Sequence, residues 1–250
     1  MRYRLPELAI LLAAGVGKRL GSAAGDVPKG LIDVGGETLV DASLRKLRGV
    51  GVQRVVLVTG HRAVAYEEVA RRWRGMVELA HNPDFATSGS LGSLRVGAQR
   101  VGDDALVLES DIIYEARALS ALTPTDSVLV SGATGLGDEV HVWAEGTRLL
   151  AVSKKRGELT AEPLGEWVGI SRLSAASLAS LSAGSVVGLP DVGDYEDAVV
   201  AVSRRWAVSC VLVSDLVWGE IDDRNQLETV RRTVAPDVRR RDDVDGPDEE

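Results

Sequence analysis

Short runs of apolar, often β-branched residues alternate along the chain with segments of helical length. The runs that predict strands are Leu8–Leu12, Arg54–Val58, Val77–Ala80, Ala105–Leu108 and Val208–Val213. The segments that predict helices are Val40–Arg48, Ala63–Trp73, Leu91–Arg100, Ser174–Leu181, Tyr195–Arg204 and Arg224–Val234, the last ending at Pro236. Because such alternation is typical of parallel sheets covered on both faces, we expect an α/β fold with a mostly parallel sheet.

Three apolar runs in the middle of the chain lie closer together, at Ser127–Ala133, Val140–Ala144 and Arg148–Val152. Turn signals at Asp138 and at Gly146-Thr147 separate them, which predicts a small antiparallel section. No repeat or linker interrupts residues 1–235, so we expect one domain there. Residues 236–250 hold seven acids against three arginines and almost no apolar residues, which predicts a disordered acidic tail.

Composition narrows the class of protein. The net charge of −8 argues against nonspecific nucleic-acid binding. No apolar run approaches the roughly 20 residues that span a bilayer, and the first residues do not resemble a signal peptide. The single cysteine, Cys210, excludes an intramolecular disulfide and a cysteine-based zinc site. We therefore expect a cytoplasmic monomer or homodimer that binds neither nucleic acid nor membrane.

The first predicted strand opens directly into a loop of small residues that carries cations. Small residues in Leu12–Gly17 let backbone N–H groups approach a phosphate, whose charge Lys18, Arg19 and Lys29 can neutralise. The loop is not a P-loop, because Arg19 follows Lys18, and it is not a dinucleotide fingerprint, because Gly21 comes one place too late. It predicts a nucleoside triphosphate site, with an ordinary glycine-rich turn as the alternative.

The use of lysine supports this interpretation. The chain has five lysines against 24 arginines. Lys18 and Lys29 flank the loop, Lys154 and Lys155 form a pair, and only Lys46 falls on a predicted helix surface. Lysine is a compact point charge on a flexible stem, so its retention at these places predicts a functional need for that geometry.

Acidic residues follow two of the predicted strands. Asp111 ends the run Ala105–Leu108, and Glu220 and Asp222 follow the run Val208–Val213 after a short loop. Three carboxylates that converge would suit Mg²⁺, which prefers carboxylates together with substrate phosphates and water. The alternatives are helix capping by Asp111 and, at the start of the last helix, by Asp222 or Asp223.

These parts suit attack by an acceptor oxyanion on the α-phosphorus of a nucleotide, with pyrophosphate as the leaving group. Such chemistry depends on positioning and on stabilisation of charge by metal and cations. Lys29 and Lys154 suit the α-phosphate and the acceptor, whereas Lys18 and Arg19 suit the β and γ groups. An anionic acceptor needs no protein nucleophile, and no Ser/His/Asp-like arrangement is evident.

The ordered motifs resemble those of nucleotidyltransferases of the sugar-phosphate and cytidylyltransferase superfamily, over about residues 8–232. In the N-terminal half the matching segments are Leu12–Leu20, Pro28–Leu31, Gly35–Leu39, Val56–Gly60, the Asn82 segment and Glu109–Asp111. In the C-terminal half they are Ser153–Lys155, Gly165–Ser171 and Gly219–Asp222, which resemble small cytidylyltransferases acting on phosphocholine or phosphonates.

The resemblance implies a Rossmann-like fold, CTP and Mg²⁺ as co-substrates, and transfer of CMP to a phosphate or phosphonate oxygen. It implies that Asp111, Glu220 and Asp222 bind the metal, that Lys29, Lys154 and Arg19 are catalytic, and that Glu166 and Lys155 bind the acceptor. The residues it implies for the nucleotide are Leu12, Ala13, Ala14, Gly15, Gly17, Lys18, Thr59, Gly60, Asn82 and Ser90. Which of Lys154 and Lys155 is the catalytic one stays open. Relatives carry an asparagine where this chain has Gly89 before Ser90.

The acceptor is the least determined element. His141, Arg156 and Arg172 are cations that suit an anionic acceptor such as phosphonoformate. The composition, rich in arginine, alanine and valine and poor in lysine, suggests a high-GC bacterial gene and so favours a phosphonate natural-product pathway. Hydroxyethylphosphonate and aminoethylphosphonate stay open. Phosphocholine is the alternative, and its aromatic cage would come from Trp143, Trp167 and Trp218.

Three other functions compete. A sugar-1-phosphate nucleotidylyltransferase using UTP or TTP usually has a longer sugar-binding section. A catalytically dead nucleotide-binding regulator would not need the retained lysines and acids. A molybdopterin-type nucleotidyltransferase shares the N-terminal motif and lacks the Gly219–Asp222 segment.

Overall fold

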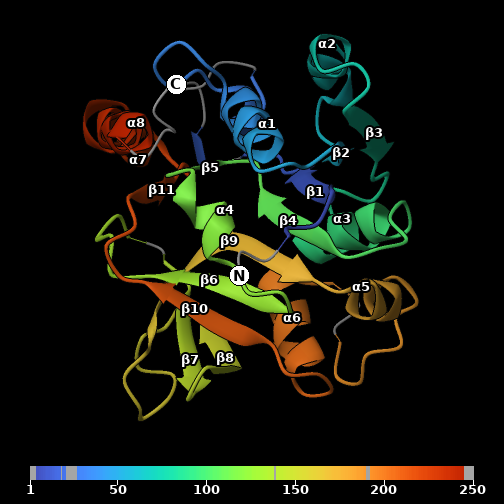
Figure 1. The fold of residues 1–250 in the computed structure, drawn as a ribbon, viewed down its shortest axis with the longest axis vertical. Helices are drawn as coiled ribbons and strands as arrows, with labels where there is room; N and C mark the ends of the chain where they lie inside the picture. Colours follow the sequence, from blue (N-terminus) through green and yellow to red (C-terminus); the bar gives the residue numbers. More distant parts are fainter. Residues whose placement is uncertain (1–3, 18, 21–26, 138, 190–191, 245–250) are drawn as a thin grey trace.

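A computed structural model of the chain describes residues 4–17, 19–20, 27–137, 139–189 and 192–244. Within these residues, nine strands form one mixed sheet in the order β3-β2-β1-β4-β9-β6-β10-β8-β7, and β5 and β11 form a separate two-stranded sheet (Figure 1). The mostly parallel, mixed α/β architecture expected from the sequence is confirmed.

The parallel half of the sheet comes from the N-terminal half of the chain. Strands β3, β2, β1 and β4 are parallel, and β9 joins them antiparallel to β4. The antiparallel section is confirmed in the β7–β8 hairpin, which also pairs with β9. The strands are β1 Leu8–Ala13, β2 Arg54–Thr59, β3 Val77–His81, β4 Ala105–Glu109, β5 Ile112–Tyr114, β6 Ser127–Ser131, β7 His141–Glu145, β8 Arg148–Ser153, β9 Gly165–Leu173, β10 Ser209–Val213 and β11 Trp218–Glu220.

Helices cover both faces of the sheet. The α-helices are α1 Leu39–Gly49, α2 Glu67–Arg72, α3 Gly89–Ala98, α4 Arg117–Ala121, α5 Ala175–Ser182, α6 Tyr195–Ser203, α7 Arg224–Thr229 and α8 Ala235–Val244. Shorter turns are the 3-10 helices η2 Lys29–Leu31 and η3 Ala63–Tyr66 and the π-helical turn η4 Val230–Val234. Helices α3, α5 and α6 pack in one apolar cluster, and α1, α2 and α4 in another on the opposite face (Figure 1).

A third apolar cluster lies beside the main sheet. It joins α7, η4 and α8 to the β5–β11 pair through Ile113, Ile221, Val230 and Val238. Ile32, which directly follows η2, belongs to the same cluster. The C-terminal helices therefore pack against the segments that follow β1 and β4 rather than against the main sheet.

Strand β9 occupies a central place in the sheet that the apolar pattern did not predict. Its two glycines, Gly165 and Gly169, weaken the strand signal because glycine is disfavoured inside strands. Gly169 has φ +80°, and a Cβ atom there would collide with the carboxylate of Glu109. The glycine thus permits both the local backbone conformation and the close approach of β4 and β9.

The C-terminal segment differs from the expectation. The helix predicted to end before Pro236 continues through η4 into α8, and residues 236–244 are helical rather than disordered. Proline cannot donate to the residue four places before it and collides with that carbonyl in a regular α-helix. The π-helical turn of η4 ends at Val234, two residues before Pro236, where such a turn accommodates the change in hydrogen bonding. The acids of residues 245–250 lie outside the described residues.

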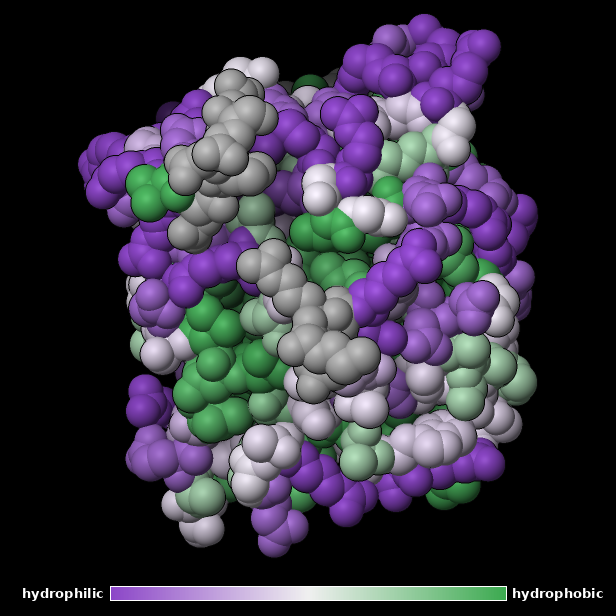
Figure 2. Space-filling model, in the orientation of Figure 1, coloured by the Kyte–Doolittle hydropathy of each residue, from purple (hydrophilic) through white to green (hydrophobic). Residues whose placement is uncertain are grey.

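The surface is mixed in character. Figure 2 shows a group of apolar side chains near β10, in which Leu212 is 45% exposed, among largely hydrophilic surroundings. None of the described helices has both the length and the apolar character needed to cross a bilayer.

We expect the same substitution to have opposite effects at two helical glycines. A Cβ on Gly97 of α3 would collide with the buried Ile10 and lie 3.1 Å from Val58, whereas a Cβ on Gly49 of α1 would meet nothing within 4 Å. Gly97→Ala should therefore lower the free energy of unfolding by about 1–3 kcal/mol. Gly49→Ala should raise it by up to about 1 kcal/mol. Urea unfolding measures both, and stabilisation by Gly97→Ala would contradict the packing described for α3.

Candidate active site

A cavity of about 300 Å³ opens where β1 and β4 end side by side. Parallel strands bring their carboxyl ends to one edge of a sheet, so the loops after β1 and β4 both reach this place. The residues expected at a site that line it are Leu12, Ala13, Ala14, Gly15, Arg19, Lys29, Ser90, Asp111, Lys154, Glu220 and Asp222. The structure therefore gathers most of the predicted site in one cavity.

Lys29 lies at the centre of this group. It begins the turn η2, and its Nζ lies 2.9 Å from Asp111 Oδ2 and forms a second ion pair with Asp222. The Lys29 side chain is 15% exposed. Burial alone would lower its pKa, but Asp111 and Asp222 outweigh burial and raise the pKa well above the ordinary lysine value. Lys29 is thus a permanent cation at neutral pH.

The β5–β11 pair brings the acids together from two distant segments. Asp111 directly precedes β5, Glu220 ends β11, and the Ile221 N–H donates to the Asp111 carbonyl at 3.0 Å. Asp111 therefore leads into a strand and does not cap a helix, which excludes that alternative. Asp223 does cap α7, in a capping box with Gln226, as the sequence suggested.

Gln226 also binds Asp222, the residue before the N-cap Asp223. Its Oε1 accepts from the backbone N–H of Asp222 at 2.6 Å. The local helix start therefore orients the carboxylate of Asp222 toward Lys29 and Arg19, with which it forms ion pairs. Burial would raise the pKa of Asp222, but these two cations lower it.

The carboxylates of Asp111, Glu220 and Asp222 each offer an oxygen within 4.8 Å of the others. Burial and then repulsion from Asp111 and Asp222 raise the pKa of Glu220 to about 9. Three carboxylates at this spacing match the oxygen ligands of hard divalent cations, and a bound dication would relieve the repulsion among them. The donor set therefore fits a metal ion.

The small-residue loop after β1 forms another part of the cavity wall. Gly17 does not line the cavity, but it packs on Lys29: with φ +64°, a Cβ there would lie 3.1 Å from Lys29 Cγ. Its left-handed backbone and the close lysine stem both favour glycine. Lys18, expected to contact phosphate, lies outside the described residues.

Several residues expected to bind the nucleotide do not line the cavity but pack behind residues that do. Thr59 and Asn82 are each 2% exposed, and Asn82 donates to the hydroxyls of Ser88 and Ser93 at 3.1 Å. Gly60 faces Phe85, which does line the cavity, and a Cβ on Gly60 would collide with it. These residues hold the segment between β3 and α3 in place. Ser90, in the first turn of α3, accepts from the Tyr195 N–H at 2.8 Å.

Two carboxylates that the sequence did not single out as site residues also line the cavity. Glu109 is the last residue of β4, and Glu196 lies in the first turn of α6 and is 8% exposed. Burial raises the pKa of Glu196 to about 7. An acid at the end of an apolar strand is a signal that could have indicated Glu109, whereas Glu196 has no sequence signal because helix starts are commonly acidic.

Only some of the residues expected to bind the acceptor line the cavity. Trp167, Trp218 and Lys154 line the cavity, but Trp143, Glu166 and Lys155 do not. Glu166 is buried and accepts from the Thr134 N–H at 2.8 Å. Glu166 thus orients the loop after β6, whereas Lys154, rather than Lys155, is the lysine of the pair that reaches the cavity.

The cations considered for an anionic acceptor lie elsewhere, so that expectation is wrong. His141, Arg156 and Arg172, all described, are absent from the cavity wall. Arg156 pairs with Glu162 and Arg172 with Asp104, each at 3.0 Å. Acidic and aromatic residues, among them Glu196, Trp167 and Trp218, line the cavity instead.

Comparison with known proteins identifies the kind of domain. Residues 9–181 match the model of the MobA-like NTP transferase domain family. A CMP-5′-(3-aminopropyl)phosphonate synthase of Streptomyces rubellomurinus is 30% identical over 88% of this chain and 37% of its own length. A bifunctional IPC transferase and DIPP synthase of Thermococcus kodakarensis is 25% identical over 92% of this chain and 51% of its own length. The chain thus spans about half or less of these relatives, and the resemblance to small cytidylyltransferases is confirmed.

A solved structure shares the fold over nearly the whole chain. The inositol-1-phosphate CTP transferase of T. maritima superposes with a TM-score of 0.77 at 19% identity, covering 94% of this chain and 99% of its own. This confirms the Rossmann-like class of the fold.

The raised pKa of Glu220 makes a prediction for the metal-free protein. The folded chain holds this proton up to about pH 9, whereas an unfolded glutamate loses it near 4.5. The unfolded state therefore binds fewer protons in between, and stability falls as the pH rises from about 5 to 9. In chelator, Glu220→Gln should flatten this fall in Tm, and the exposed Glu158→Gln should not. Equal slopes for wild type and Glu220→Gln would contradict it.

Proposed function

Because the chain belongs to the MobA-like NTP transferase domain family, we propose that it is a Mg²⁺-dependent cytidylyltransferase that transfers CMP from CTP to a small phosphonate, releasing pyrophosphate. The observation that carries this proposal is the pair of salt bridges that Lys29 forms with Asp111 and Asp222 in the cavity beside the small-residue loop. Two relatives support the choice of nucleotide: the CMP-5′-(3-aminopropyl)phosphonate synthase, and a 2-aminoethylphosphonate cytidylyltransferase of Lancefieldella rimae that is 27% identical over 44% of this chain.

The reaction forms a bond from an acceptor oxygen to the α-phosphorus and breaks the bond between that phosphorus and the bridging oxygen of pyrophosphate. Charge grows on the phosphoryl oxygens, so fixed cations stabilise the transition state. Lys29 suits this role because its raised pKa keeps it charged and makes it unable to act as a base. Arg19 and Lys154 supply further positive charge along the cavity wall.

The carboxylates of Asp111, Glu220 and Asp222 would hold the Mg²⁺ ion. The ion would supply charge neutralisation and orientation of the triphosphate. Lys29 keeps Asp111 and Asp222 facing one another, and the N–H of Asp222 is held by Gln226. Backbone N–H groups of Ala13–Gly15, which line the cavity where β1 ends, would bind phosphate oxygens.

Glu196 in the cavity wall favours an acceptor with a cationic group over a carboxylated phosphonate such as phosphonoformate. Its carboxylate would repel a second carboxylate and attract an ammonium group, whereas burial and neighbouring acids raise the pKa of Glu109 well above its ordinary value and disfavour its charged form. The acceptor we propose is therefore an aminoalkylphosphonate, with its phosphonate near Lys29 and its amine near Glu196. The names of two relatives, which specify aminopropyl- and aminoethylphosphonate, support this class.

Phosphocholine is the second candidate. Trp167 and Trp218 line the same cavity, and aromatic faces bind quaternary ammonium groups. Both indoles are fixed, since Trp167 Nε1 donates to the Tyr195 hydroxyl and Trp218 Nε1 to the Ser131 hydroxyl.

A panel of substrates tests these assignments. Pyrophosphate release would be measured with CTP, UTP, TTP or ATP against aminoethylphosphonate, aminopropylphosphonate, phosphonoformate, phosphocholine and a sugar 1-phosphate. We expect CTP with an aminoalkylphosphonate to be fastest. Glu196→Gln should raise the KM of that acceptor about tenfold, because a charged partner is lost, and leave the KM of CTP unchanged.

The matched control is Asp197→Asn, an exposed neighbour on α6 that does not line the cavity. Preference for phosphonoformate would overturn the acceptor class, and preference for UTP or TTP with a sugar 1-phosphate would overturn the cytidylyltransferase assignment.

Lys29→Ala should lower kcat by about two orders of magnitude or more, because it removes a charge that stabilises the transition state. The KM values of CTP and acceptor should change much less. Arg74→Ala, which removes an exposed cation outside the cavity, should leave kcat unchanged. Steady-state kinetics of pyrophosphate release measures both variants, and a pure KM effect of Lys29→Ala would demote Lys29 to a binding role.

A further inference from the structure

The β5–β11 ribbon, defined here as Ile112–Tyr114 paired with Trp218–Glu220, positions the acids but lies outside the main sheet. One end of the ribbon carries Asp111 and Glu220. Two strands of three residues are not stable alone in water, so the ribbon needs support from elsewhere. The contacts at its opposite end, roughly 10 Å from the acids at the usual rise per residue, supply that support.

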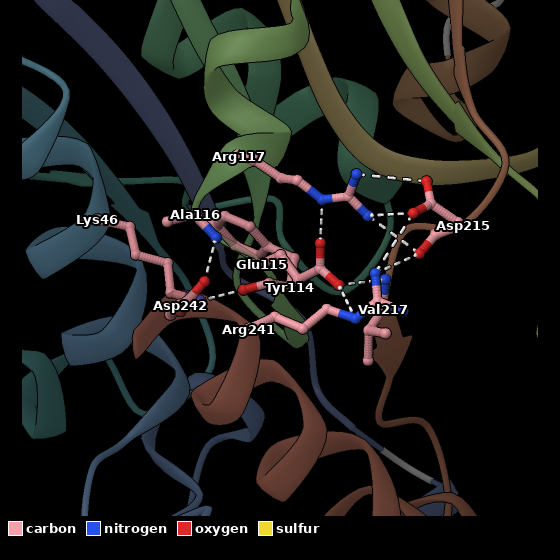
Figure 3. A network of polar contacts seen from close by, with 9 residues as sticks. All are labelled: Lys46, Tyr114, Glu115, Ala116, Arg117, Asp215, Val217, Arg241 and Asp242. Atoms are coloured by element: carbon pink, nitrogen blue, oxygen red, sulfur yellow. Dashed lines mark hydrogen bonds and ion pairs between the residues drawn. The ribbon is translucent and has the colours of Figure 1, made fainter. Parts of the chain in front are cut away.

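Glu115 closes the far end of the ribbon. It is 1% exposed, its Oε1 accepts from the Val217 N–H at 3.0 Å, and its own N–H donates to the Val217 carbonyl at 3.2 Å. Two arginines neutralise the buried carboxylate: Arg117 of α4 and, at 3.3 Å, Arg241 of α8 (Figure 3). Both arginines also bond to Asp215, in the turn before β11.

Asp242 of α8 makes the second connection. It accepts from the Ala116 N–H at 2.7 Å and lies 2.9 Å from Lys46 Nζ (Figure 3). Lys46 is 6% exposed and donates to the Tyr114 carbonyl in the ribbon, so the expectation that it is an ordinary surface lysine is wrong. A buried lysine needs a counter-charge, and α8 provides it.

The same C-terminal helices contact the other half of the site. Arg231 of η4 donates to the Asp33 carbonyl and Arg239 of α8 to the Gly35 carbonyl, each at 2.8 Å. Asp33 and Gly35 lie in the loop that follows η2, the turn that begins with Lys29. Helix α8 therefore spans the loop that carries the cation and the ribbon that carries the acids.

We propose that Asp242 is a positioning residue for the carboxylate cluster: by docking α8 on Lys46 and Ala116, it fixes the ribbon and hence the placement of Asp111 and Glu220 relative to Lys29. This inference rests on the proposed function in one respect: it assumes that Asp111, Glu220 and Asp222 bind a metal ion. Residues that orient metal ligands from outside typically change metal affinity by 10–100-fold when lost.

Three variants test this inference. Asp242→Asn removes the charge, and the double variant Lys46→Met with Asp242→Asn also removes the buried cation that would otherwise lack a partner. Asp243→Asn is the matched control, because it removes the same charge from an exposed position on the same helix. Mn²⁺ binding is measured by calorimetry without nucleotide, Tm by thermal unfolding, and the Mg²⁺ dependence of pyrophosphate release by kinetics.

We expect Asp242→Asn to weaken Mn²⁺ binding and to raise the half-saturating Mg²⁺ concentration about tenfold or more, while the control matches wild type. The double variant should regain Tm and stay weak in metal binding, a split that a merely structural role would not produce. Recovery of both properties together, or unchanged metal binding in Asp242→Asn, would overturn the inference. If Asp242→Asn does not fold, Mn²⁺ binding by the double variant tests the inference. Absence of Mn²⁺ binding by wild type would instead count against the proposed function.

Discussion

The site depends on the placement of one buried cation among carboxylates of like charge. Lys29 pairs with Asp111, 82 residues away, and with Asp222, 193 residues away, although both would repel each other and Glu220 if left alone. Bringing such groups out of water costs free energy that only close opposite charge can offset. The ion pairs of Lys29 therefore explain how three acids can share one place, and why a divalent cation fits there.

Two separate structural units meet at this cation. The parallel strands β1 and β4 deliver the small-residue loop and Asp111 to one edge of the main sheet. The ribbon delivers Glu220, and the start of α7 orients Asp222 through Gln226. The strands β1 and β4 lie in the two main apolar clusters, whereas the ribbon is also covered by the third cluster, to which α7, η4 and α8 contribute. Of the residues described in these C-terminal helices, Gln226 of α7 lines the cavity.

The cavity wall carries charges of both signs, and this is the physical basis of the acceptor we propose. Lys29, Lys154 and Arg19 line the cavity together with Glu196, and Lys154 lies close enough to Glu196 to lower the pKa of that carboxyl. A small molecule with a phosphonate and an amine can meet an opposite charge with each group. A second anionic group in place of the amine would meet Glu196 instead.

The sequence by itself determined the α/β class, most of the strands and the main residues that gather around Lys29 in the cavity, because apolar periodicity and the spacing of small residues, lysines and acids are local properties. It missed β9, whose Gly169 obscures the strand signal, and the helix through Pro236, whose ordering depends on contacts of Arg241 and Asp242. Only the tertiary structure decided that Lys46 is buried, that Lys154 rather than Lys155 reaches the cavity, and that Glu196 faces it. Each of these depends on which distant segment packs alongside, and no local pattern encodes that.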